Sequence, residues 1–565
     1  MERTKILVGW VTLILGAVAG LWVATELFAW WAGSPPQLGT SWGSVGGLGL
    51  YPPWAILGWI MAIGNGYGFG HPAVRMGWQA LAVGAVGGFL PVAILGGIAK
   101  RRLGDPQGTV HGSGRWATQK EIARAGLHGE EGIALGKIGG QYLIDDSPTH
   151  VLMFAPTRSG KGVGVVIPTL CTWPGSVIVN DIKGENWDKT AKYRANKLGQ
   201  RCIKFNPTDK SSTHYNPLAE VGFTPGDEPS IDVPDVQKVA EILIDPEGKG
   251  ELDYWRSAGM TLLVGALQYA FVKAWKEGET ATLTDLLAVL TSEGGPKTNH
   301  ERLTYMMGVC EEWEPSLSGP IVSVLNEMYS KAEKELSGVW SSATNALSLY
   351  RDPVVQGVVA TSDFCLDDIA NGECPTSLYL VVPPSDLSRT KPLIRLVLNQ
   401  LGKRLAQKLN KKHSVLMLLD EFPTLGRLDF FETALAYLAG YKVRCLLITQ
   451  SLAQLDNVYG RNNSIMANCS TRICFAPNDI KTAQTIARLL GEATVRIERG
   501  KNRENQGAET LSYSDQYVKR YLLTPGEVMG MPAEQELIFT SNTPPIRAEK
   551  IRYYDDPRFK DVWRP

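Results

Sequence analysis

A glycine-containing segment beginning at residue 155 has the residue types that bind the phosphates of a nucleotide. It reads Ala155-Pro-Thr-Arg-Ser-Gly-Lys-Gly162, follows an apolar run typical of a buried strand, and precedes a run compatible with a helix. In a P-loop, main-chain N–H groups and a helix N-terminus face the phosphates, and a lysine reaches the β- and γ-phosphate oxygens. The segment therefore predicts an ATP-binding loop made of Thr157, Arg158, Ser159, Gly160, Lys161 and Gly162.

This loop departs from the general P-loop pattern G-x-x-x-x-G-K-[ST] at two positions. Ala155 replaces the first glycine, and Gly162 replaces the residue whose hydroxyl usually binds Mg²⁺. An ordinary turn between a strand and a helix is the alternative for this segment taken alone. A second glycine-lysine segment, Gly248-Lys249-Gly250, has no strand pattern immediately before it, and we interpret it as a surface turn.

A pair of acids supplies the second half of a nucleotide site. The apolar run Ser414–Leu419 ends in Asp420-Glu421, which is the Walker B arrangement of a buried strand with carboxylates at its tip. The first acid can organise Mg²⁺, and the second can align and deprotonate the attacking water. Taken alone, the pair could simply end a strand before the turn at Phe422. Because it follows a P-loop in the same chain, we predict ATP hydrolysis with Asp420 at the Mg²⁺ ion and Glu421 as the base.

Two further strand ends carry polar side chains. The run Val443–Thr449 leads into Gln450, which we predict to contact the attacking water or the γ-phosphate; the alternative is a hydrogen bond within a loop. A second strand ends in Asn180-Asp181 and points to the ligand edge of the same sheet. For this second pair, a structural turn and a functional role are both open.

The elements that must position these groups form an α/β pattern. Continuous apolar character predicts a mostly parallel sheet buried on both faces, and it marks the strands His150–Ala155, Ser176–Asn180, Cys202–Phe205, Ser377–Val382, Ser414–Leu419, Val443–Thr449, Thr471–Phe475 and Glu536–Thr540. Between residues 230 and 350 the pattern is helical, with the helices Val236–Ile244, Tyr254–Trp275, Leu283–Thr291, Ser316–Tyr329 and Ser341–Tyr350. We predict an all-α insertion at 230–350 in a nucleotide-binding domain formed by 104–229 and 351–565. The polar stretch Arg499–Gln506 is interpreted as a mobile loop.

The first hundred residues differ from the rest of the chain in charge. Leaving His71 aside, only Glu26 and Arg75 are charged between Ile6 and Ala99, and two apolar runs there are each long enough to cross a bilayer as a helix. Basic residues precede the first run and follow the second, so both ends are predicted to be cytoplasmic. A cleaved signal peptide is the alternative for the first run. We predict a two-helix transmembrane hairpin with a short periplasmic loop at 1–103.

The 565-residue chain as a whole is electrically balanced, with 57 basic and 57 acidic residues, and 44% of its residues are hydrophobic. This composition excludes a largely disordered or fibrous chain, and no global basicity indicates nucleic acid. Any DNA contact must therefore come from a local surface. One basic stretch is a candidate, although a solvated helix face is the more common reason for such a pattern; it contains Lys403, Arg404, Lys408, Lys411 and Lys412.

At these motifs the chain resembles the TraG/TraD-type coupling proteins of conjugation and type IV secretion. The resemblance covers nearly the whole chain, and its blocks are individually short but specific in combination. Besides the two nucleotide motifs, they are Ile167-Pro-Thr-Leu170, Asp181-Ile-Lys-Gly-Glu185, Pro375-Thr-Ser-Leu-Tyr-Leu-Val-Val-Pro-Pro-Ser-Asp386, Leu523-Thr-Pro-Gly-Glu527 and Pro544-Pro-Ile-Arg547. The two-span N-terminus also fits this family.

The resemblance implies a homo-hexameric, RecA-like ATPase, anchored as a multi-pass protein in the bacterial inner membrane with most of its chain in the cytoplasm. Such a protein would receive a relaxase bound to single-stranded DNA, or an effector protein, and pass it to the inner-membrane components of a secretion channel. Lys161, Asp420, Glu421 and Gln450 fall on the family's motif positions. Hydrolysis between subunits would require an arginine from a neighbour, and Arg351 and Arg472 both stay open for this role.

Three functions are therefore compared. The first is a DNA-stimulated ATPase that drives or licenses the transfer of a nucleoprotein substrate. The second is a membrane receptor that docks substrates, with the nucleotide acting as an assembly switch. The third is a DNA pump of the FtsK kind, against which the block at 375–386 and the two-span anchor argue.

Overall fold

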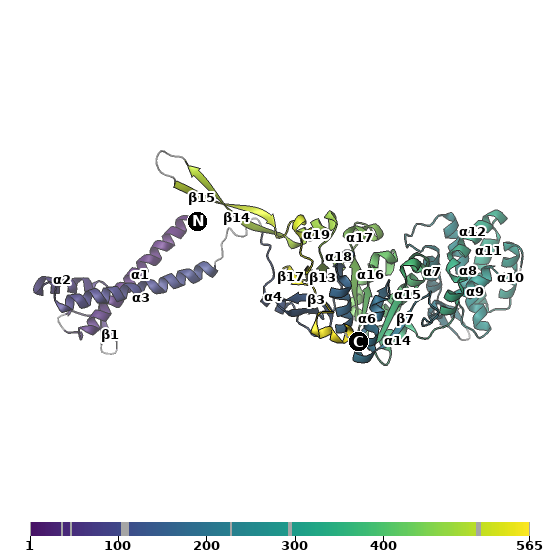
Figure 1. Ribbon diagram of the computed structural model, residues 1–565, viewed down its shortest axis with the longest axis horizontal. Helices are drawn as coiled ribbons and strands as arrows, with labels where there is room; N and C mark the ends of the chain where they lie inside the picture. The colour runs from purple at the N-terminus through teal and green to yellow at the C-terminus, as the bar shows by residue number, and fades with distance from the viewer. Residues whose placement is uncertain are drawn as a thin grey trace. The chain divides into compact units, whose positions relative to one another are not determined.

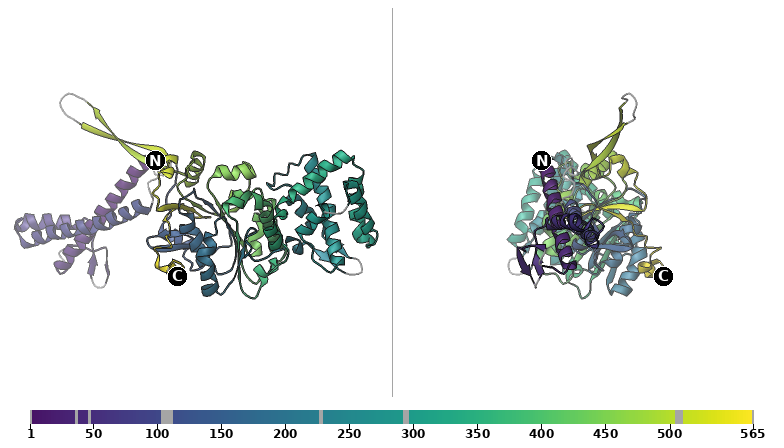
Figure 2. Two further views of the ribbon diagram at one scale, coloured as in Figure 1. Left: turned by 45° about the vertical axis from the view of Figure 1, so that its right-hand side comes forward. Right: turned by 90° about the vertical axis from the view of Figure 1, so that its left-hand side faces the viewer.

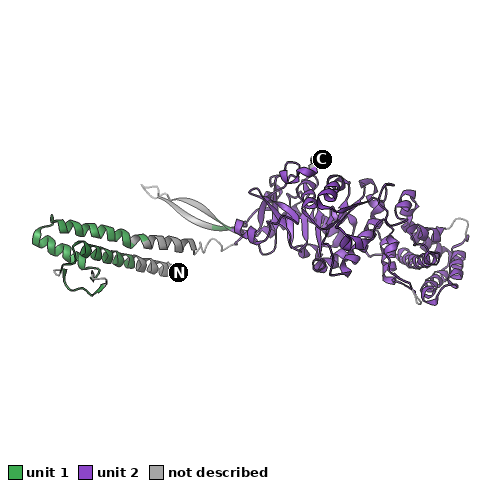
Figure 3. Ribbon diagram, turned by 90° about the horizontal axis from the view of Figure 1, so that it is seen from below, with its two compact units in different colours: residues 1–111, 494–518 green, residues 112–493, 519–565 purple. Residues whose placement is uncertain are grey.

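The computed structural model describes residues 2–35, 38–45, 48–102, 112–225, 229–291, 296–503 and 510–563. These residues belong to two units, which Figure 3 distinguishes by colour. The first unit combines Met1–His111 with Thr494–Val518, and the second combines Gly112–Ala493 with Lys519–Pro565.

Three helices and a small antiparallel strand pair make up the N-terminal part of the first unit. The elements are α1 (Glu2–Trp31), β1 (Gly43–Val45), β2 (Leu48–Leu50), α2 (Ala55–Tyr67) and α3 (Pro72–Arg102). Helix α1 packs against α3 through glycines: a Cβ atom on Gly20 would lie 2.7 Å from the carbonyl oxygen of Gly84, and one on Gly84 would lie 2.7 Å from the Cβ of Ala24. Such close backbone approach is typical of helix pairs in membranes.

Among the described residues, one helical window is long and apolar enough to cross a membrane, Ile14–Trp31 within α1. The transmembrane prediction for the first apolar run is consistent with this window. Helix α3, which carries the second predicted run, spans 31 residues, but its described residues contain no such window, so the second crossing stays a prediction.

A two-stranded sheet is formed by β14 (Glu492–Arg503) and β15 (Thr510–Tyr521). The expectation of a mobile loop at Arg499–Gln506 is therefore wrong for residues 499–503, which lie in β14, whereas 504–509 lie outside the described residues. The polar residues of this segment were interpreted by composition alone, and strand pairing with a later segment overrides composition.

An eleven-stranded sheet forms the centre of the second unit (Figure 1). Its order is β4-β3-β17-β16-β13-β5-β12-β11-β6-β10-β7, and the strands from β13 to β7 are parallel. The remaining four add as an antiparallel flank. The bounds are β3 (Ile133–Ile138), β4 (Gln141–Asp145), β5 (Val151–Phe154), β6 (Ser176–Asp181), β7 (Arg201–Phe205), β10 (Thr376–Val381), β11 (Val415–Leu419), β12 (Val443–Thr449), β13 (Thr471–Cys474), β16 (Gln535–Phe539) and β17 (Ile546–Glu549).

All eight predicted strands are confirmed. Most of them are largely apolar and buried on both faces, whereas β7 is partly exposed at the edge of the sheet and β16 carries the buried Glu536. Alternate residues of β5 enter two different cores: Leu152 and Phe154 lie in one, and Val151 and Met153 lie in the other. The missed strands belong to the flank. In β17, buried and exposed residues alternate, so its apolar run is too short to mark a strand by itself.

Helices cover the sheet, and Figure 2 shows them on both of its faces. Outside the helical region, the main helices are α4 (Gln119–Arg124), α5 (Ile167–Thr172), α6 (Glu185–Leu198), α13 (Pro353–Val358), α14 (Leu366–Asn371), α15 (Leu387–Gln407), α16 (Asp429–Leu438), α17 (Leu452–Tyr459), α18 (Ile465–Asn468), α19 (Ile480–Leu490), α20 (Pro525–Met529) and α21 (Lys560–Trp563). A two-strand pair, β8 (Phe223–Thr224) with β9 (Ser230–Ile231), precedes the helical region.

The helical region comprises α7 (Val233–Ile244), α8 (Tyr254–Lys276), α9 (Leu283–Thr291), α10 (Asn299–Cys310), α11 (Pro315–Tyr329) and α12 (Glu333–Ala346). No strand occurs among the described residues from 233 to 346, as the pattern there indicated. Helix α8 is the central element, since α7, α9, α11 and α12 all pack on it. The region shares a continuous apolar core with α15 and α16 of the α/β part, so its predicted boundary at 230–350 stays a prediction.

Candidate nucleotide site

The predicted phosphate-binding loop lies between β5 and a helix, as a P-loop requires. It begins beside β12, where the Ala155 N–H donates to the Thr449 carbonyl at 2.9 Å. Gly160 has a φ of +90°, and no heavy atom would lie within 4 Å of a Cβ placed there. The chain then enters a π-helical turn, Gly162–Val166, that leads into α5. This geometry leaves room in front of the loop and places the start of a helix directly behind the lysine.

Two acids at the tip of β11 contact Lys161, and Gln450 at the tip of the neighbouring strand β12 contacts one of these acids. Its Nζ lies 2.8 Å from Oδ1 of Asp420, and it also donates a hydrogen bond to Oε1 of Glu421. The Gln450 amide donates to Oε2 of Glu421 at 2.8 Å. The strands that deliver these groups are neighbours in the order β5-β12-β11, so the parallel arrangement brings their carboxyl ends together.

Asn180 and Asp181 stand beside the acidic tip. The Asn180 amide donates to the main-chain carbonyl of Asp420 at 2.7 Å, and Asp181 accepts the N–H of Trp187 at 2.9 Å. Strand β6 pairs directly with β11, with Asn180 opposite Leu419. Asn180 therefore makes a structural contact with the tip of β11, whereas Asp181 bonds the main chain at Trp187, and a functional role for Asp181 stays a prediction.

The electrostatics of the site follow from burying several charges together. Burial raises the pKa of Asp420, and the neighbouring Glu421 raises it further, while Lys161 acts in the opposite direction. Burial lowers the pKa of Lys161, but the carboxylates of Asp420 and Glu421 outweigh burial and the net pKa is raised. Burial, with a contribution from Asp420, raises the pKa of Asp181 to about 6. A polyanionic ligand in front of this loop would compete with Asp420 and Glu421 for the ammonium group of Lys161.

Asp420 and Asp181 give the site oxygen donors of the kind that Mg²⁺ prefers. This ion is usually held by one or two carboxylates together with the phosphates of the substrate, rather than by a complete protein cage. The described residues contain no cluster of three or more His, Cys, Asp or Glu that could hold a metal alone. Gly162 supplies no hydroxyl, but the buried hydroxyl of Ser159 has no hydrogen-bond partner among the described residues. These residues fit Mg²⁺ bound with a nucleotide.

Lys550 is a residue of the loop's surroundings that sequence reasoning missed. Its Nζ donates to the Ser159 carbonyl at 3.0 Å and lies 3.6 Å from the centre of the Phe475 ring. The contact joins residues 391 positions apart, so no local spacing signals it. Lys550 therefore holds the backbone of the phosphate-binding loop from the side opposite to its N–H groups.

Glu536, on β16 next to this lysine, leads to a prediction about pH. Its carboxyl is fully buried, neither oxygen has a hydrogen-bond partner among the described residues, and burial raises its pKa to about 8. A raised folded-state pKa means that stability falls as the pH rises from about 4.5 to about 8. Glu536→Gln cannot ionise at this position, so its free energy of unfolding should not show this fall. We expect the free energy of unfolding of Glu536→Gln, relative to that of the wild type, to increase by about 1–3 kcal/mol between pH 5.5 and pH 7.5. Chemical denaturation of the full chain at both pH values measures this difference, and a constant difference would contradict it.

The predicted basic stretch is largely neutralised within the chain. Arg404 pairs with Glu220 at 3.1 Å, Lys408 with Asp367 at 3.2 Å, and Lys403 with Asp235. The two remaining residues bond main-chain carbonyls: Lys412 that of Glu373, and Lys411, only 4% exposed, those of Lys408 and Tyr441. DNA binding by this stretch stays a prediction, and Lys411 is buried against its own chain.

The two candidate arginines differ in their surroundings. Arg351 ends a 3₁₀ turn, Ser348–Arg351, and is exposed. Arg472 lies on β13, is half-buried, and donates from both Nε and Nη2 to the Met466 carbonyl. An arginine that acts on a neighbouring subunit must reach beyond its own surface, so these positions favour Arg351 over Arg472.

Comparison with known proteins gives a consistent result. The family described as Type IV secretory system Conjugative DNA transfer matches residues 115–564. Conjugal transfer protein TraG of Escherichia coli is 34% identical, over 97% of this chain and 91% of that protein. Protein VirD4 of Rhizobium radiobacter is 32% identical, over 80% of this chain and 65% of that protein.

Solved structures of the plasmid coupling protein TrwB are similar to this chain in fold. The trigonal form with sulphate has a TM-score of 0.57 at 18% identity and covers 77% of this chain and 92% of its own. The form in complex with ADP and Mg²⁺ has a TM-score of 0.56 at the same identity and the same coverage of both chains. The predicted RecA-like P-loop fold is confirmed.

Proposed function

Because the chain belongs to the type IV secretory system conjugative DNA transfer family, we propose that it is a membrane-anchored ATPase of conjugation. In this proposal it couples a relaxase bound to single-stranded DNA, or an effector protein, to a type IV secretion channel. The observation that carries the proposal is the convergence of Lys161 with Asp420 and Glu421, which lie about 260 residues further along the chain.

In this site, ATP and Mg²⁺ take the place where the P-loop N–H groups and the acidic tip meet. Two TrwB structures are complexes with ADP and Mg²⁺ and with a non-hydrolysable ATP analogue, which supports the same ligands here. Asp420, with Asp181 beside it, would hold Mg²⁺, which supplies neutralisation of phosphate charge. The Ser159 hydroxyl, which is buried without a hydrogen-bond partner among the described residues, could take the place of the hydroxyl that Gly162 lacks.

Each polar side chain of the site then has a distinct part in hydrolysis. Lys161 exchanges its two carboxylate partners for phosphate oxygens, which releases Glu421 to accept a proton from the attacking water. Gln450, which already bonds Glu421, orients that water. The Asn180 amide keeps the backbone of Asp420 in place throughout.

We further propose that α1 and α3 cross the bacterial inner membrane as a hairpin, leaving most of the chain in the cytoplasm. The glycine contacts of α1 with α3 support this arrangement, because they pair the two helices within one chain. Arg3 and Lys5 lie at one end, and Lys100 to Arg102 lie at the other, as the positive-inside rule requires of two cytoplasmic ends.

A homo-hexamer completes the proposal. Sites at subunit borders would each receive an arginine from the neighbouring subunit, for which we propose Arg351. Six copies would also repeat the exposed residues Lys403, Arg404, Lys408 and Lys412 around one axis, where DNA phosphates could replace the partners that these residues have within their own chain.

Turnover and transfer measured together test this function against its alternatives. We expect the full chain in detergent to hydrolyse ATP, faster with single-stranded DNA, and we expect Lys161→Ala to stop both turnover and conjugative transfer. If transfer persisted without ATP turnover, the docking receptor would be favoured over the ATP-driven motor. Stimulation by duplex DNA alone, without any need for a relaxase in transfer, would instead favour a DNA pump.

A further inference from the structure

The loop that follows the acidic tip forms a buried junction with the connection between α7 and α8. The Arg427 N–H donates to the Glu247 carbonyl at 3.0 Å. Gly426 has a φ of +74°, and a Cβ on it would lie 2.8 Å from the same carbonyl oxygen. The two backbones are therefore in direct contact, with no space for a side chain between them.

Arg395 of α15 closes this junction from a third side. Its guanidinium, 3% exposed, donates from Nη1 to the Asp245 carbonyl and from Nη2 to the Arg427 carbonyl, each at 2.6 Å. The Asp245 carboxylate in turn accepts the N–H groups of Gly248 at 3.0 Å and Gly250 at 2.8 Å. A rigid, planar fork that donates to two carbonyls holds them at a fixed separation.

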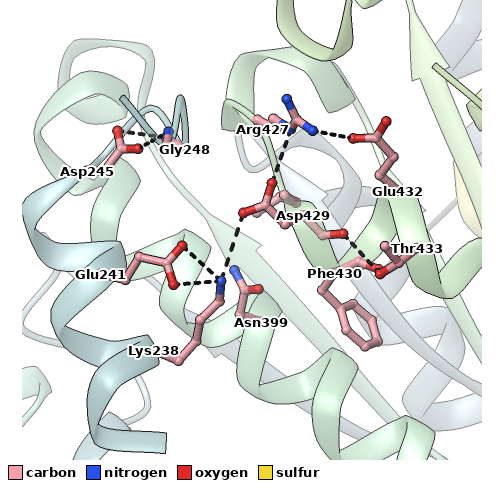
Figure 4. Close-up of polar contacts among 12 residues, drawn as sticks. Lys238, Glu241, Asp245, Gly248, Asn399, Arg427, Asp429, Phe430, Glu432 and Thr433 are labelled. Atoms are coloured by element: carbon pink, nitrogen blue, oxygen red, sulfur yellow. Dashed lines mark hydrogen bonds and ion pairs between the residues drawn. The ribbon is translucent and has the colours of Figure 1, made fainter. Parts of the chain in front are cut away.

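Half-buried ion pairs lie over the same junction, as Figure 4 shows. The chain of pairs runs through Glu432, Arg427, Asp429, Lys238 and Glu241, with separations of 2.9, 3.1, 3.9 and 3.0 Å. Because these pairs stay partly open to water, each contributes little stability. The buried Arg395 is therefore the part of the junction on which the connection depends.

The loop between the tip and the junction is short and internally bonded. The Thr424 N–H donates to the Glu421 carbonyl at 2.8 Å, and the Gly426 N–H donates to the Pro423 carbonyl at 3.2 Å. The intervening residues form a single 3₁₀ turn, Phe422–Leu425. A displacement of the Glu421 main chain must therefore displace the Arg427 carbonyl that Arg395 holds, or break these bonds.

We propose that Arg395 is a positioning residue that couples Glu421 to the Asp245–Gly250 connection at the base of the helical region. The inference rests on the proposed function, since nucleotide binding at Lys161 is what shifts Glu421. Coupling of this kind is reciprocal in binding free energy, so a ligand of α8–α12 changes nucleotide affinity through the same junction.

Hydrogen exchange of the wild-type full chain in detergent, with and without a non-hydrolysable ATP analogue and Mg²⁺, is the first test. We expect the analogue to slow exchange at 157–164 and to change the exchange rate of 245–252 several-fold. Protection at 157–164 with no change at 245–252 overturns the coupling alone. No protection at 157–164 overturns the nucleotide site itself, and the coupling with it.

Variants then test the role of Arg395. Arg395→Met is expected to keep analogue-dependent protection at 157–164, to lose the response at 245–252, and to reduce kcat more than it changes KM. Arg395→Lys keeps a donor and should restore part of the response. The control is Lys391→Met, on the same helix, because Lys391 pairs with Glu247 of the same connection at the surface. An unchanged response in folded Arg395→Met and Arg395→Lys overturns the proposal.

Discussion

Glu421→Gln is expected to reduce the kcat of ATP hydrolysis by about 10²–10⁴-fold while ATP binding is retained. The amide keeps the size of the side chain and can still bond Lys161 and Gln450, but it cannot accept a proton from water. The phosphate-binding loop does not involve this side chain except through Lys161. Single-turnover hydrolysis and equilibrium binding of a fluorescent ATP analogue separate the two effects, and conjugative transfer should stop.

Glu534→Gln is the matched control, because Glu534 is an exposed carboxylate on the same unit that pairs with Arg552 at 3.3 Å. Its turnover should equal that of the wild type. If Glu421→Gln hydrolysed ATP at the wild-type rate, the base would have to be another group, and the assignment of the acidic tip would be wrong.

Lys161→Ala is expected to weaken ATP binding by about 10–150-fold, because a hydrogen bond to a charged group contributes about 1.5–3 kcal/mol. The same change leaves Asp420 and Glu421 buried together without their cation, so the pKa of Asp420 rises further. Turnover and transfer should both be lost. Isothermal titration with ATP and Mg²⁺ measures the affinity of the full chain.

Lys183→Ala provides the comparison, since Lys183 is an exposed lysine two residues after Asp181 and near the same edge of the sheet. It should bind ATP as the wild type does. Equal affinities of Lys161→Ala and Lys183→Ala would show that the lysine of the loop does not reach the phosphates.

Sequence reasoning predicted the features that depend on the burial of a single strand. Strands such as β11 and β12 are buried on both faces and are mainly apolar, with Arg444 of β12 as an exception, and the first polar residues after them mark the ligand edge. This regularity placed Asp420, Glu421 and Gln450 at one edge before any pairing was known. The structure brings Asp420 and Glu421 to Lys161, and Gln450 to Glu421.

Contacts between distant segments could not be predicted in this way. Lys550 reaches the Ser159 carbonyl, and Arg395 reaches two carbonyls, through tertiary packing that no spacing encodes. The basic stretch shows the opposite error, because a run of lysines gives no sign of the acids that neutralise it from other elements. The strand β14 was missed for the same reason, since its partner β15 begins beyond residue 509.

The central claim is that one triphosphate binds between the loop at 157–162 and the acids at 420–421. A structure of the full chain with a non-hydrolysable ATP analogue and Mg²⁺ tests it most directly. We expect the phosphates to lie against the loop N–H groups, with the Lys161 ammonium moved from the carboxylates to phosphate oxygens and Mg²⁺ at Asp420. An analogue bound elsewhere, with Lys161 still paired to Asp420 and Glu421, would contradict the account.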